Sequence, residues 1–311
     1  MKFYIHHTAE LGSFKKTRIV NFLFNHPTHL QLQSVTGWHV FEYRDKKTDK
    51  VWACISFHLK AGEARCPLRA PFGSIELYRK LDEDYLAQFI IQVEEQLGKL
   101  GAKKIVIRNA PELYNEEQSK LLKKALLKSE FESSEEVSSV IHLDGKPFEK
   151  KIKISERQKL KKAASMFRFT KVNKSELIEL YKFIATCRKE RQQSLSMTLI
   201  ELKKLVTAFP DSVLFFKVGT VEETTAAAIV IRVSKEVLYT FYYAHAKAHN
   251  RISPVVFLIS GIYDFAVEHK YKMIDLGTSM IDRQINRSLL HFKKSIGGVT
   301  TRKLTFTKLL L

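Results

Sequence analysis

The sequence predicts an α/β protein made of two similar domains with mixed central sheets. The chain has 311 residues, which is more than one small core needs and suits two domains of about 150 residues each. An order of three strand-like runs, a helix and a short buried strand occurs twice. The passages from helix to strand at 96–109 and 265–278 align with each other. A repeated order of this kind indicates two domains of one type.

The first half of the chain reads as a meander followed by helices and further strands. Turn signals and runs rich in β-branched and aromatic residues predict strands at 38–45, 50–60, 62–70, 103–109 and 136–144. Helices are predicted at 82–101 and 115–129. In the first of these helices, apolar residues share one face, namely Leu86, Phe89, Ile90, Val93 and Leu97.

The second half repeats this order. Strands are predicted at 211–219, 224–233, 235–246 and 272–277, with a helix at 253–270 whose inner face holds Val256, Ile259, Tyr263 and Val267. A last helical pattern covers 285–296, with Ile285, Leu289, Phe292 and Ile296 on one face. The boundary is expected near 145–152, which gives domains at 1–148 and 149–311.

A basic helix is predicted at the start of the second domain, at 154–167. Ser155 followed by Gln158 has the pattern of a helix-capping box. The helix carries Arg157, Lys159, Lys161 and Lys162, which we call the basic collar. Such a collar either neutralises a phosphate backbone or is a solvated helix face.

Charge is the most unusual property of the composition. There are 52 Lys and Arg against 33 Asp and Glu, a net charge of +19. Lys146–Lys174 holds eleven basic and two acidic residues, and Arg283–Lys308 holds seven basic and no acidic residues. Clustered charge predicts a polyanionic partner, such as RNA, a phosphorylated ligand or an anionic membrane surface, with general solubility as the alternative.

The composition also suggests a compartment. The N-terminus lacks the order of a signal peptide, and the longest apolar stretch is shorter than a membrane span and contains Asp264. Three cysteines suit a reducing compartment. We therefore expect a cytoplasmic protein, with peripheral contact at the inner face of the membrane as a variant. No CxxC or HExxH pattern supports a metal site.

The chain resembles a known family in its second half. Pro254, then Asp275 and Gly277 at a strand end, then Phe292-Lys293 before Gly297 follow the order of the C-terminal repeat of Fem-type peptidyltransferases and BioF2-like acyltransferases. The RQKLKKA helix is similar to a basic helix of the Fem family, which often has two arginines where this chain has Arg157-Gln158. The chain also has no room for the helical arm of some Fem proteins. APFGSIEL in the first half is similar to the family's Pro-x-Gly segment.

The resemblance implies a fold and a reaction. Both groups have tandem acetyltransferase-like (GNAT) domains and transfer acyl groups to nitrogen. Fem enzymes use aminoacyl-tRNA and modify cell-wall precursors, whereas BioF2-like relatives are expected to use acyl-CoA or acyl carrier protein. The resemblance thus implies an N-acyltransferase or aminoacyltransferase acting on an amine of a cell-wall or lipid precursor. It implies no tightly bound cofactor, because the acyl donor is a co-substrate.

Candidate catalytic residues follow the last two strands. In GNAT-like folds two parallel strands separate around the acyl end of the donor, which places the His245 and Gly277 ends at the site. Lys293 is expected to stabilise an oxyanion or phosphate, or else to be a lysine that complements a helix C-terminus. The resemblance places the carbonyl of Phe292 near the nucleophile. Asp275 is either a general base or a structural acid that binds loop amides.

Further residues are assigned to binding. Asn250, Arg251 and Ser253 precede a helix N-terminus and are candidates for the donor's phosphates, together with Arg157, Lys161 and Lys162. The stretch HNRIS lacks the glycines of CoA-dependent members, which favours a tRNA or other donor. Arg69 and Gly73 in a degenerate first domain, with Tyr243, are candidates for acceptor binding; Tyr242 and Tyr243 are expected on opposite faces. His245 or His249 is either a proton acceptor or a surface residue.

Two other functions remain open. A basic RNA-binding protein with a degenerate GNAT fold would explain the charge without catalysis, although aromatic residues for base stacking are scarce there. An acetyl-CoA-dependent N-acetyltransferase is the second. The sequence identifies neither the acceptor nor the oligomeric state.

Overall fold

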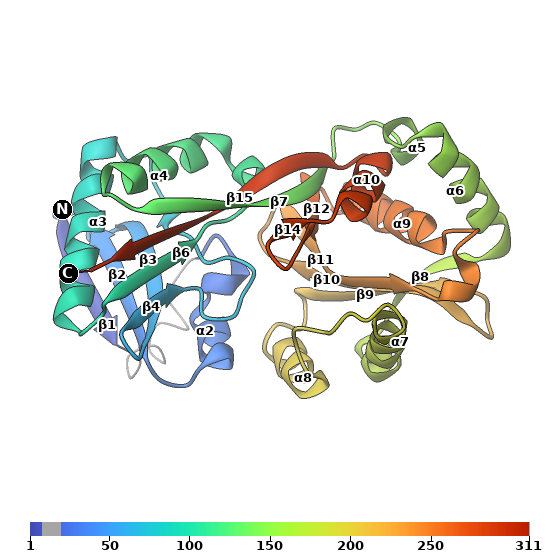
Figure 1. Cartoon of the computed structure of the whole chain (residues 1–311), viewed down its shortest axis with the longest axis horizontal. Coiled ribbons are helices and arrows are strands. Elements are labelled where there is room, and N and C mark those ends of the chain that lie inside the picture. The colour runs from blue at the N-terminus through green and yellow to red at the C-terminus, as the bar shows by residue number, and fades with distance from the viewer. Residues whose placement is uncertain (8–19, 311) are drawn as a thin grey trace. The chain divides into compact units, whose positions relative to one another are not determined.

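Two units make up the chain in the computed structural model, which describes residues 1–7 and 20–310 (Figure 1). Unit 1 comprises residues 1–136 and 301–311, and unit 2 comprises residues 137–300. The last strand of the chain therefore belongs to unit 1, whereas the sequence suggests one domain from 149 to 311. The reason is that this strand pairs with a strand of the first half of the chain.

Unit 1 is built on a mixed sheet. Its strand order is β1 (Lys2–His7), β2 (Trp38–Arg44), β3 (Val51–Lys60), β4 (Glu63–Cys66), β6 (Lys104–Arg108) and β15 (Val299–Leu309), with β5 (Glu76–Leu77) beside β3. Neighbours are antiparallel except β4 and β6, which are parallel, with Ala64 opposite Ile105. The helix before β6 provides the crossover that a parallel pair needs.

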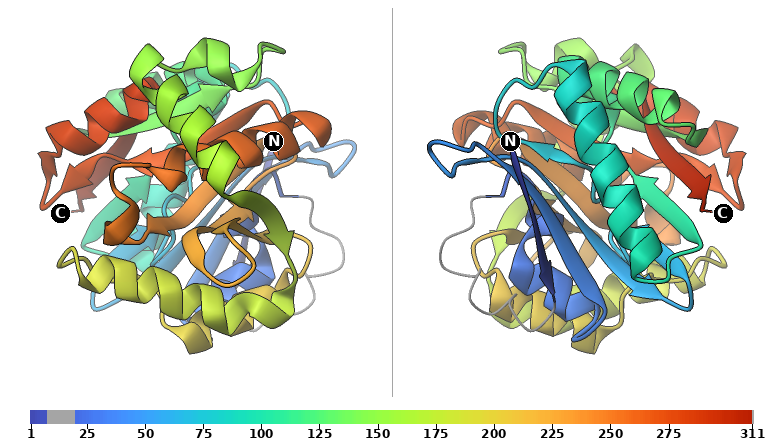
Figure 2. Two further views of the ribbon diagram at one scale, coloured as in Figure 1. Left: turned by 90° about the vertical axis from the view of Figure 1, so that its right-hand side faces the viewer. Right: turned by 90° about the vertical axis from the view of Figure 1, so that its left-hand side faces the viewer.

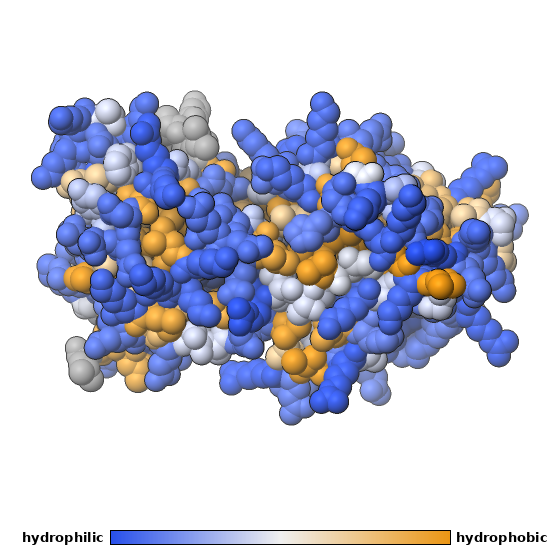
Figure 3. All heavy atoms as spheres, turned by 90° about the horizontal axis from the view of Figure 1, so that it is seen from above, coloured by the Kyte–Doolittle hydropathy of each residue, from blue (hydrophilic) through white to orange (hydrophobic). Residues whose placement is uncertain are grey.

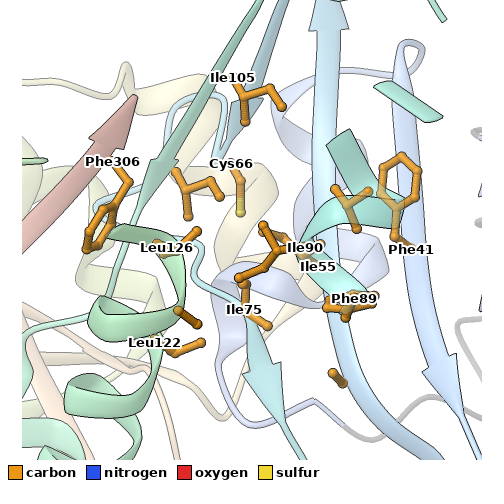
Figure 4. Packing of buried hydrophobic residues seen from close by; sticks show 14 of the residues in the cluster. Phe41, Ile55, Cys66, Ile75, Phe89, Ile90, Ile105, Leu122, Leu126 and Phe306 are labelled. Carbon is orange, nitrogen blue, oxygen red and sulfur yellow. The ribbon is translucent and has the colours of Figure 1, made fainter. Parts of the chain in front are cut away.

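Two helices cover one face of this sheet. The helix α3 (Glu83–Lys99) begins at Asp82, whose carboxylate accepts a hydrogen bond from Tyr85 N, and α4 (Glu116–Lys128) begins at Asn115, whose side chain caps Gln118 N. The buried residues of α3 are the five predicted ones. They form one apolar cluster with α4 and with Phe306 of β15 (Figure 4). The short helix α2 (Pro27–Gln33) contributes Leu30 to a separate cluster around Trp38.

Unit 2 repeats the sheet of unit 1. Its strand order is β7 (Glu132–His142), β12 (Met273–Thr278), β11 (Val237–His245), β10 (Thr224–Arg232), β9 (Val213–Gly219) and β8 (Arg168–Val172). Again one pair is parallel, β11 with β12, and the helix α9 (Pro254–Glu268) connects them. The predicted repetition of helix and parallel strand is thereby confirmed, because α3 and β6 correspond to α9 and β12.

Helices cover both faces of the unit 2 sheet (Figures 1 and 2). On one face, α9 packs with α5 (Phe148–Lys151) and α6 (Ile154–Met166) over an extensive apolar cluster. On the other face lie α7 (Leu177–Lys189) and α8 (Leu199–Ala208). A small hairpin, β13 (Met280–Ile281) and β14 (Gln284–Ile285), and the helix α10 (Arg287–Ser295) follow β12.

Three details of the sequence prediction are wrong. The helix α6 begins after Lys153 without a side-chain cap, so Ser155 and Gln158 form no capping box. Val267 is 44% exposed, whereas its neighbour Ala266 is fully buried, so the inner face of α9 passes through Ala266 in this turn and not through Val267. Ile285 is 48% exposed and belongs to β14, so the apolar face of α10 begins only at Leu289.

Candidate functional site

The parallel strands β11 and β12 separate within unit 2. Their pairing covers three positions, Val237 with Met273, Leu238 with Ile274 and Tyr239 with Asp275. Beyond this point β11 continues to His245 beside β10 alone, and β12 continues beside β7, where Thr278 lies opposite Ser138. The edge of β11 that faces β12 thus has no ladder partner after Tyr239 among the described residues. β11 and β12 are the two strands that the sequence analysis expected to separate.

A β-bulge lies at the same position in β11. Tyr239 is paired with Ile231 of β10, whereas Tyr242 is paired with Ile229, so β11 has one residue more than β10 in this interval. A bulge reverses the alternation of side chains and bends the strand. As a result Tyr242 lies against the α7 side of the sheet, while Tyr243 packs against the cluster around α9. The predicted placement of these two tyrosines on opposite faces agrees with this arrangement.

Asp275 and Gly277 form a tight turn at the end of β12. Gly277 has a φ of +76°, a conformation that glycine adopts at least cost, and its amide donates to Asp275 Oδ1 at 2.6 Å. The backbone oxygen of Asp275 accepts a bond from Thr240 Oγ1 of β11 at 2.9 Å. Asp275 is 3% exposed. The sequence analysis gave two alternatives for Asp275, a general base or a structural acid that binds loop amides. The bond from the Gly277 amide is a contact of the second kind.

Lys293 is buried against the same strand end. Its side chain is 1% exposed, and Nζ donates to the carbonyl oxygens of Gly277 at 2.8 Å and Thr278 at 2.6 Å. Where β12 leaves β11, side chains therefore satisfy the backbone groups that a ladder would otherwise pair. The carbonyl of Phe292 accepts bonds from Ser295 Oγ and Ile296 N within the end of α10. Transition-state roles for Lys293 and Phe292 remain predictions.

Arg188 of α7 faces the tyrosines of β11. Its guanidinium carbon lies 5.1 Å from the centre of the Tyr242 ring, and Nη1 donates to Ser194 O at 3.4 Å. Its Nε is buried and has no hydrogen-bond partner among the described residues. The Tyr242 hydroxyl shares a hydrogen bond with Ser196 Oγ and accepts another from Met197 N, which fixes the α7–α8 connection.

Burial raises the pKa of the nearby tyrosines. Burial raises the pKa of Tyr243 to about 12 and also raises the pKa of Tyr239, and the negative charge of Asp275 adds to both shifts. The positive charge of Arg188 opposes both shifts. Tyr239 lies over Gly277, since a Cβ built on that glycine would be 3.5 Å from its ring. Protonated tyrosines therefore surround the point at which the strands separate.

His245 marks the end of β11 and contacts two residues. Its Nε2 lies 2.8 Å from Asn250 Oδ1 and 3.3 Å from Arg191 Nη2. Burial lowers the pKa of His245, the bond to Asn250 opposes the shift, and Arg191 and His249 add to it. The imidazole is therefore neutral at pH 7. His249 Nε2 lies 3.1 Å from Glu223 Oε1.

The turn that leads into α9 uses its own backbone amides. The amides of Ile252 and Ser253 both donate to the carbonyl of His249, and the amide of Asn250 donates to that of Lys247. Ser253 is buried with a φ of +54° and makes no side-chain cap. Arg251 is exposed and forms no ion pair with a described residue. Anion binding at a helix start requires backbone amides that have no internal partner, and few amides in this turn are of that kind.

The basic collar on α6 is largely on the surface. Lys161 and Lys162 are exposed, Arg157 is exposed and donates through Nε to Ile152 O, and Lys159 pairs with Glu156 at 2.8 Å. The opposite side of the helix buries Leu160 and Ala163. The face shown in Figure 3 is mostly hydrophilic, with apolar residues in small separate areas.

The remaining predicted residues, Arg69 and Gly73, belong to unit 1. Arg69 is exposed and binds α2, because its amide donates to Gln33 Oε1 at 2.7 Å and its guanidinium to Gln33 O at 3.0 Å. Gly73 leaves no room for a side chain, since a Cβ would lie 2.5 Å from Cys66 Sγ. Both contacts are structural, and an acceptor role for either residue remains a prediction.

Sequence reasoning missed several residues of this site. Arg188 and Arg191 were not singled out, because nothing in the local pattern of α7 connects it to a strand that begins almost fifty residues later. A signal for the adjacent helix was present: Thr198 and Glu201 have the spacing of a capping box, and the structure contains both of its hydrogen bonds.

The length and composition of the helices bear on whether the chain could span a membrane. Within residues 1–7 and 20–310, none of the helices has the length and apolar content needed to cross a membrane.

The comparisons with known proteins identify the fold. No protein-family model matches the chain, and no curated protein matches it in sequence. Among solved structures, FemX matches with a TM-score of 0.72 at 12% identity, over 100% of this chain and 98% of FemX. L-PGS from Bacillus licheniformis matches with a TM-score of 0.60 at 12% identity, over 96% of this chain and 90% of that one.

A third match connects the repetition to a named architecture. A tandem GNAT protein from the clavulanic acid biosynthesis pathway matches with a TM-score of 0.51 at 8% identity, over 99% of this chain and 98% of that one. The chain therefore has a Fem-like fold of two tandem GNAT-like units, and the fold predicted from the sequence is confirmed.

Proposed function

We propose that the chain is an acyltransferase that moves an acyl or aminoacyl group from an activated donor to an amine. The separation of β11 and β12 at Tyr239 and Asp275 carries the proposal. An extended acyl arm can bind along the open edge of β11, because backbone N–H groups there have no ladder partner among the described residues. Such fixed donors are suited to stabilise the oxygen of a tetrahedral intermediate.

The reaction forms a C–N bond and breaks the C–O or C–S bond of the donor. The amine must lose a proton, and His245, neutral at pH 7 because burial lowers its pKa, is the acceptor that we assign. The leaving oxygen or sulfur must gain a proton, and Tyr239 stays protonated because its pKa is raised. Lys293 holds the end of β12 in place through two carbonyl contacts.

The donor that we favour is an aminoacyl-tRNA. The turn before α9 uses its amides internally, which leaves little for the pyrophosphate of CoA. The exposed cations of α6 suit a nucleic-acid backbone. FemX and L-PGS match with higher TM-scores than the tandem GNAT protein, and the resemblance to the Fem family implies aminoacyl-tRNA as the donor. The acceptor is an amine of a cell-wall or lipid precursor.

Thermal shift and product analysis test this proposal. Charged tRNA should stabilise the protein more than the same tRNA after deacylation, because only the charged form places an acyl group beside β11; saturation at one hundred times Kd adds about 2.7 kcal/mol. Acetyl-CoA and long-chain acyl-CoA serve as the competing donors. An amide product should appear by mass spectrometry with one of the acceptor classes.

The alternatives have distinct outcomes. Equal stabilisation by charged and deacylated tRNA, with no amide from any donor and acceptor, would show an RNA-binding protein and overturn the proposal. Stabilisation by acetyl-CoA alone would keep the acyltransferase and replace the donor.

A further inference from the structure

A short hairpin projects from the end of β12. It consists of β13 and β14 joined by Asp282 and Arg283, which both have a positive φ, of 49° and 62°. A two-residue turn of this kind usually contains glycine or asparagine, and an arginine adopts it only against a steric penalty. Backbone strain of this type persists where the surrounding structure enforces it.

The base of the hairpin is held firmly. Ser279 N donates to Val137 O at 2.7 Å, and Asn286 N donates to Ser279 O at 2.8 Å. Lys293 binds the two carbonyls that precede this base. Asn286 also caps α10 through Leu289 N at 2.9 Å. These contacts hold the base of the hairpin at the end of β12 (Figure 1).

The tip exposes branched apolar residues on both of its faces. Ile281 is 45% exposed and lies opposite Gln284, and Ile285 is 48% exposed and lies opposite Met280. Because directly opposed residues share a face, the two isoleucines lie on opposite faces of the hairpin. A folded chain gains nothing from isoleucines that face water on both sides of a projection.

The surroundings of the tip are basic. Arg283 at the turn and Arg287 in the first turn of α10 are exposed, and neither forms an ion pair with a described residue. Asp282 is the one acid between Ser279 and Ser295. Apolar side chains flanked by unneutralised cations are the combination that binds the interface of an anionic bilayer.

We propose that the β13–β14 hairpin and the first turn of α10 form a contact surface for membranes that contain anionic lipid. RNA fits this surface less well. No Phe, Tyr or Trp lies between Ser279 and His291 for base stacking, and phosphates offer nothing to the isoleucines. The inference goes beyond the proposed transfer reaction and does not need it, since membrane binding is measured without donor or acceptor.

Vesicle co-sedimentation tests the proposal with the full chain. The protein should bind vesicles of equal phosphatidylglycerol and phosphatidylcholine, bind phosphatidylcholine alone at least about tenfold more weakly, and lose affinity as salt rises. Ile281→Asp and Ile285→Asp should each weaken binding at least about tenfold, and Arg283→Gln about fivefold. Val221→Asp is the matched control, because Val221 is 95% exposed elsewhere in unit 2.

The results that overturn the proposal are specific. They are the absence of wild-type binding to anionic vesicles, wild-type affinity in both isoleucine variants, or an equal loss in Val221→Asp. Loss of bulk tRNA binding in the isoleucine variants, with vesicle binding intact, would also overturn it. Unchanged far-UV circular dichroism and thermal midpoints in all variants exclude unfolding as the cause of any loss.

Discussion

Replacement of Lys293 by methionine tests how the end of β12 is held. The change keeps most of the side-chain volume and removes the ammonium that binds the carbonyls of Gly277 and Thr278. Hydrogen bonds to a charged group contribute about 1.5 to 3 kcal/mol each, so two contribute about 3 to 6 kcal/mol. Relief from burying a charge offsets part of this loss. We expect unit 2 to lose about 2 to 4 kcal/mol of its free energy of unfolding.

The assay must distinguish the two units. Trp38 and Trp52 both lie in unit 1, so tryptophan fluorescence follows unit 1 alone. Hydrogen exchange of the segment 273–278 reports on unit 2, and amides there should exchange at least about 30-fold faster in Lys293→Met, since about 1.36 kcal/mol corresponds to a tenfold change. Fluorescence-detected unfolding of unit 1 in urea should stay unchanged.

Lys294→Met is the matched control. Lys294 is the next residue on α10 and is exposed, so its loss should change stability by less than about 0.5 kcal/mol. The reasoning fails if Lys293→Met exchanges at the rate of the control, because the two carbonyl contacts would then contribute nothing.

Three further changes follow from the structure. Gly277→Ala places a side chain at a φ of +76° beside Tyr239, which costs about 1 to 2 kcal/mol. The variant should transfer acyl groups more slowly while its far-UV circular dichroism stays the same. Full turnover would contradict the location of the site. Phe306→Ala should destabilise unit 1 by about 3 to 5 kcal/mol by tryptophan fluorescence, with Leu309→Ala, at 70% exposure, as the neutral control; equal effects would argue against β15 as a core strand. Burial lowers the pKa of His29 from 6.5 to about 4, so the unfolded chain takes up the proton at a higher pH than the folded chain does. The free energy of unfolding of unit 1 should therefore fall by about 3 kcal/mol between pH 6.5 and pH 4. His29→Gln should flatten this pH profile, and an unchanged slope would refute the assignment.

The sequence predicted the elements whose pattern is local. The five apolar residues on one face of α3 are all buried, because a helix that covers one side of a sheet needs a single stripe. The prediction was poorer for α9, which is apolar around most of its circumference, so periodicity alone did not show that Val267 is exposed. Divergence of β11 and β12 was inferred from the family resemblance rather than from spacing.

Features set by distant partners were not predictable in this way. β15 alternates apolar and polar residues, yet its partner β6 lies nearly two hundred residues earlier, and no local signal connects them. The bulge in β11 depends on its register with β10. Lys293 could be placed near the site, but its two carbonyl acceptors depend on the fold of α10 over β12.

Because residues 301–311 return to unit 1, synthesis of unit 1 begins before that of unit 2 and is completed after it. Unit 2 is one uninterrupted stretch, so all of its residues have been synthesised before residue 301. Unit 1 begins earlier but waits for β15, and until then the outer edge of β6 remains open to foreign strands. The half that is synthesised first is therefore completed last. During synthesis, the unpaired edge of β6 is where chaperones would have to prevent wrong strand pairing.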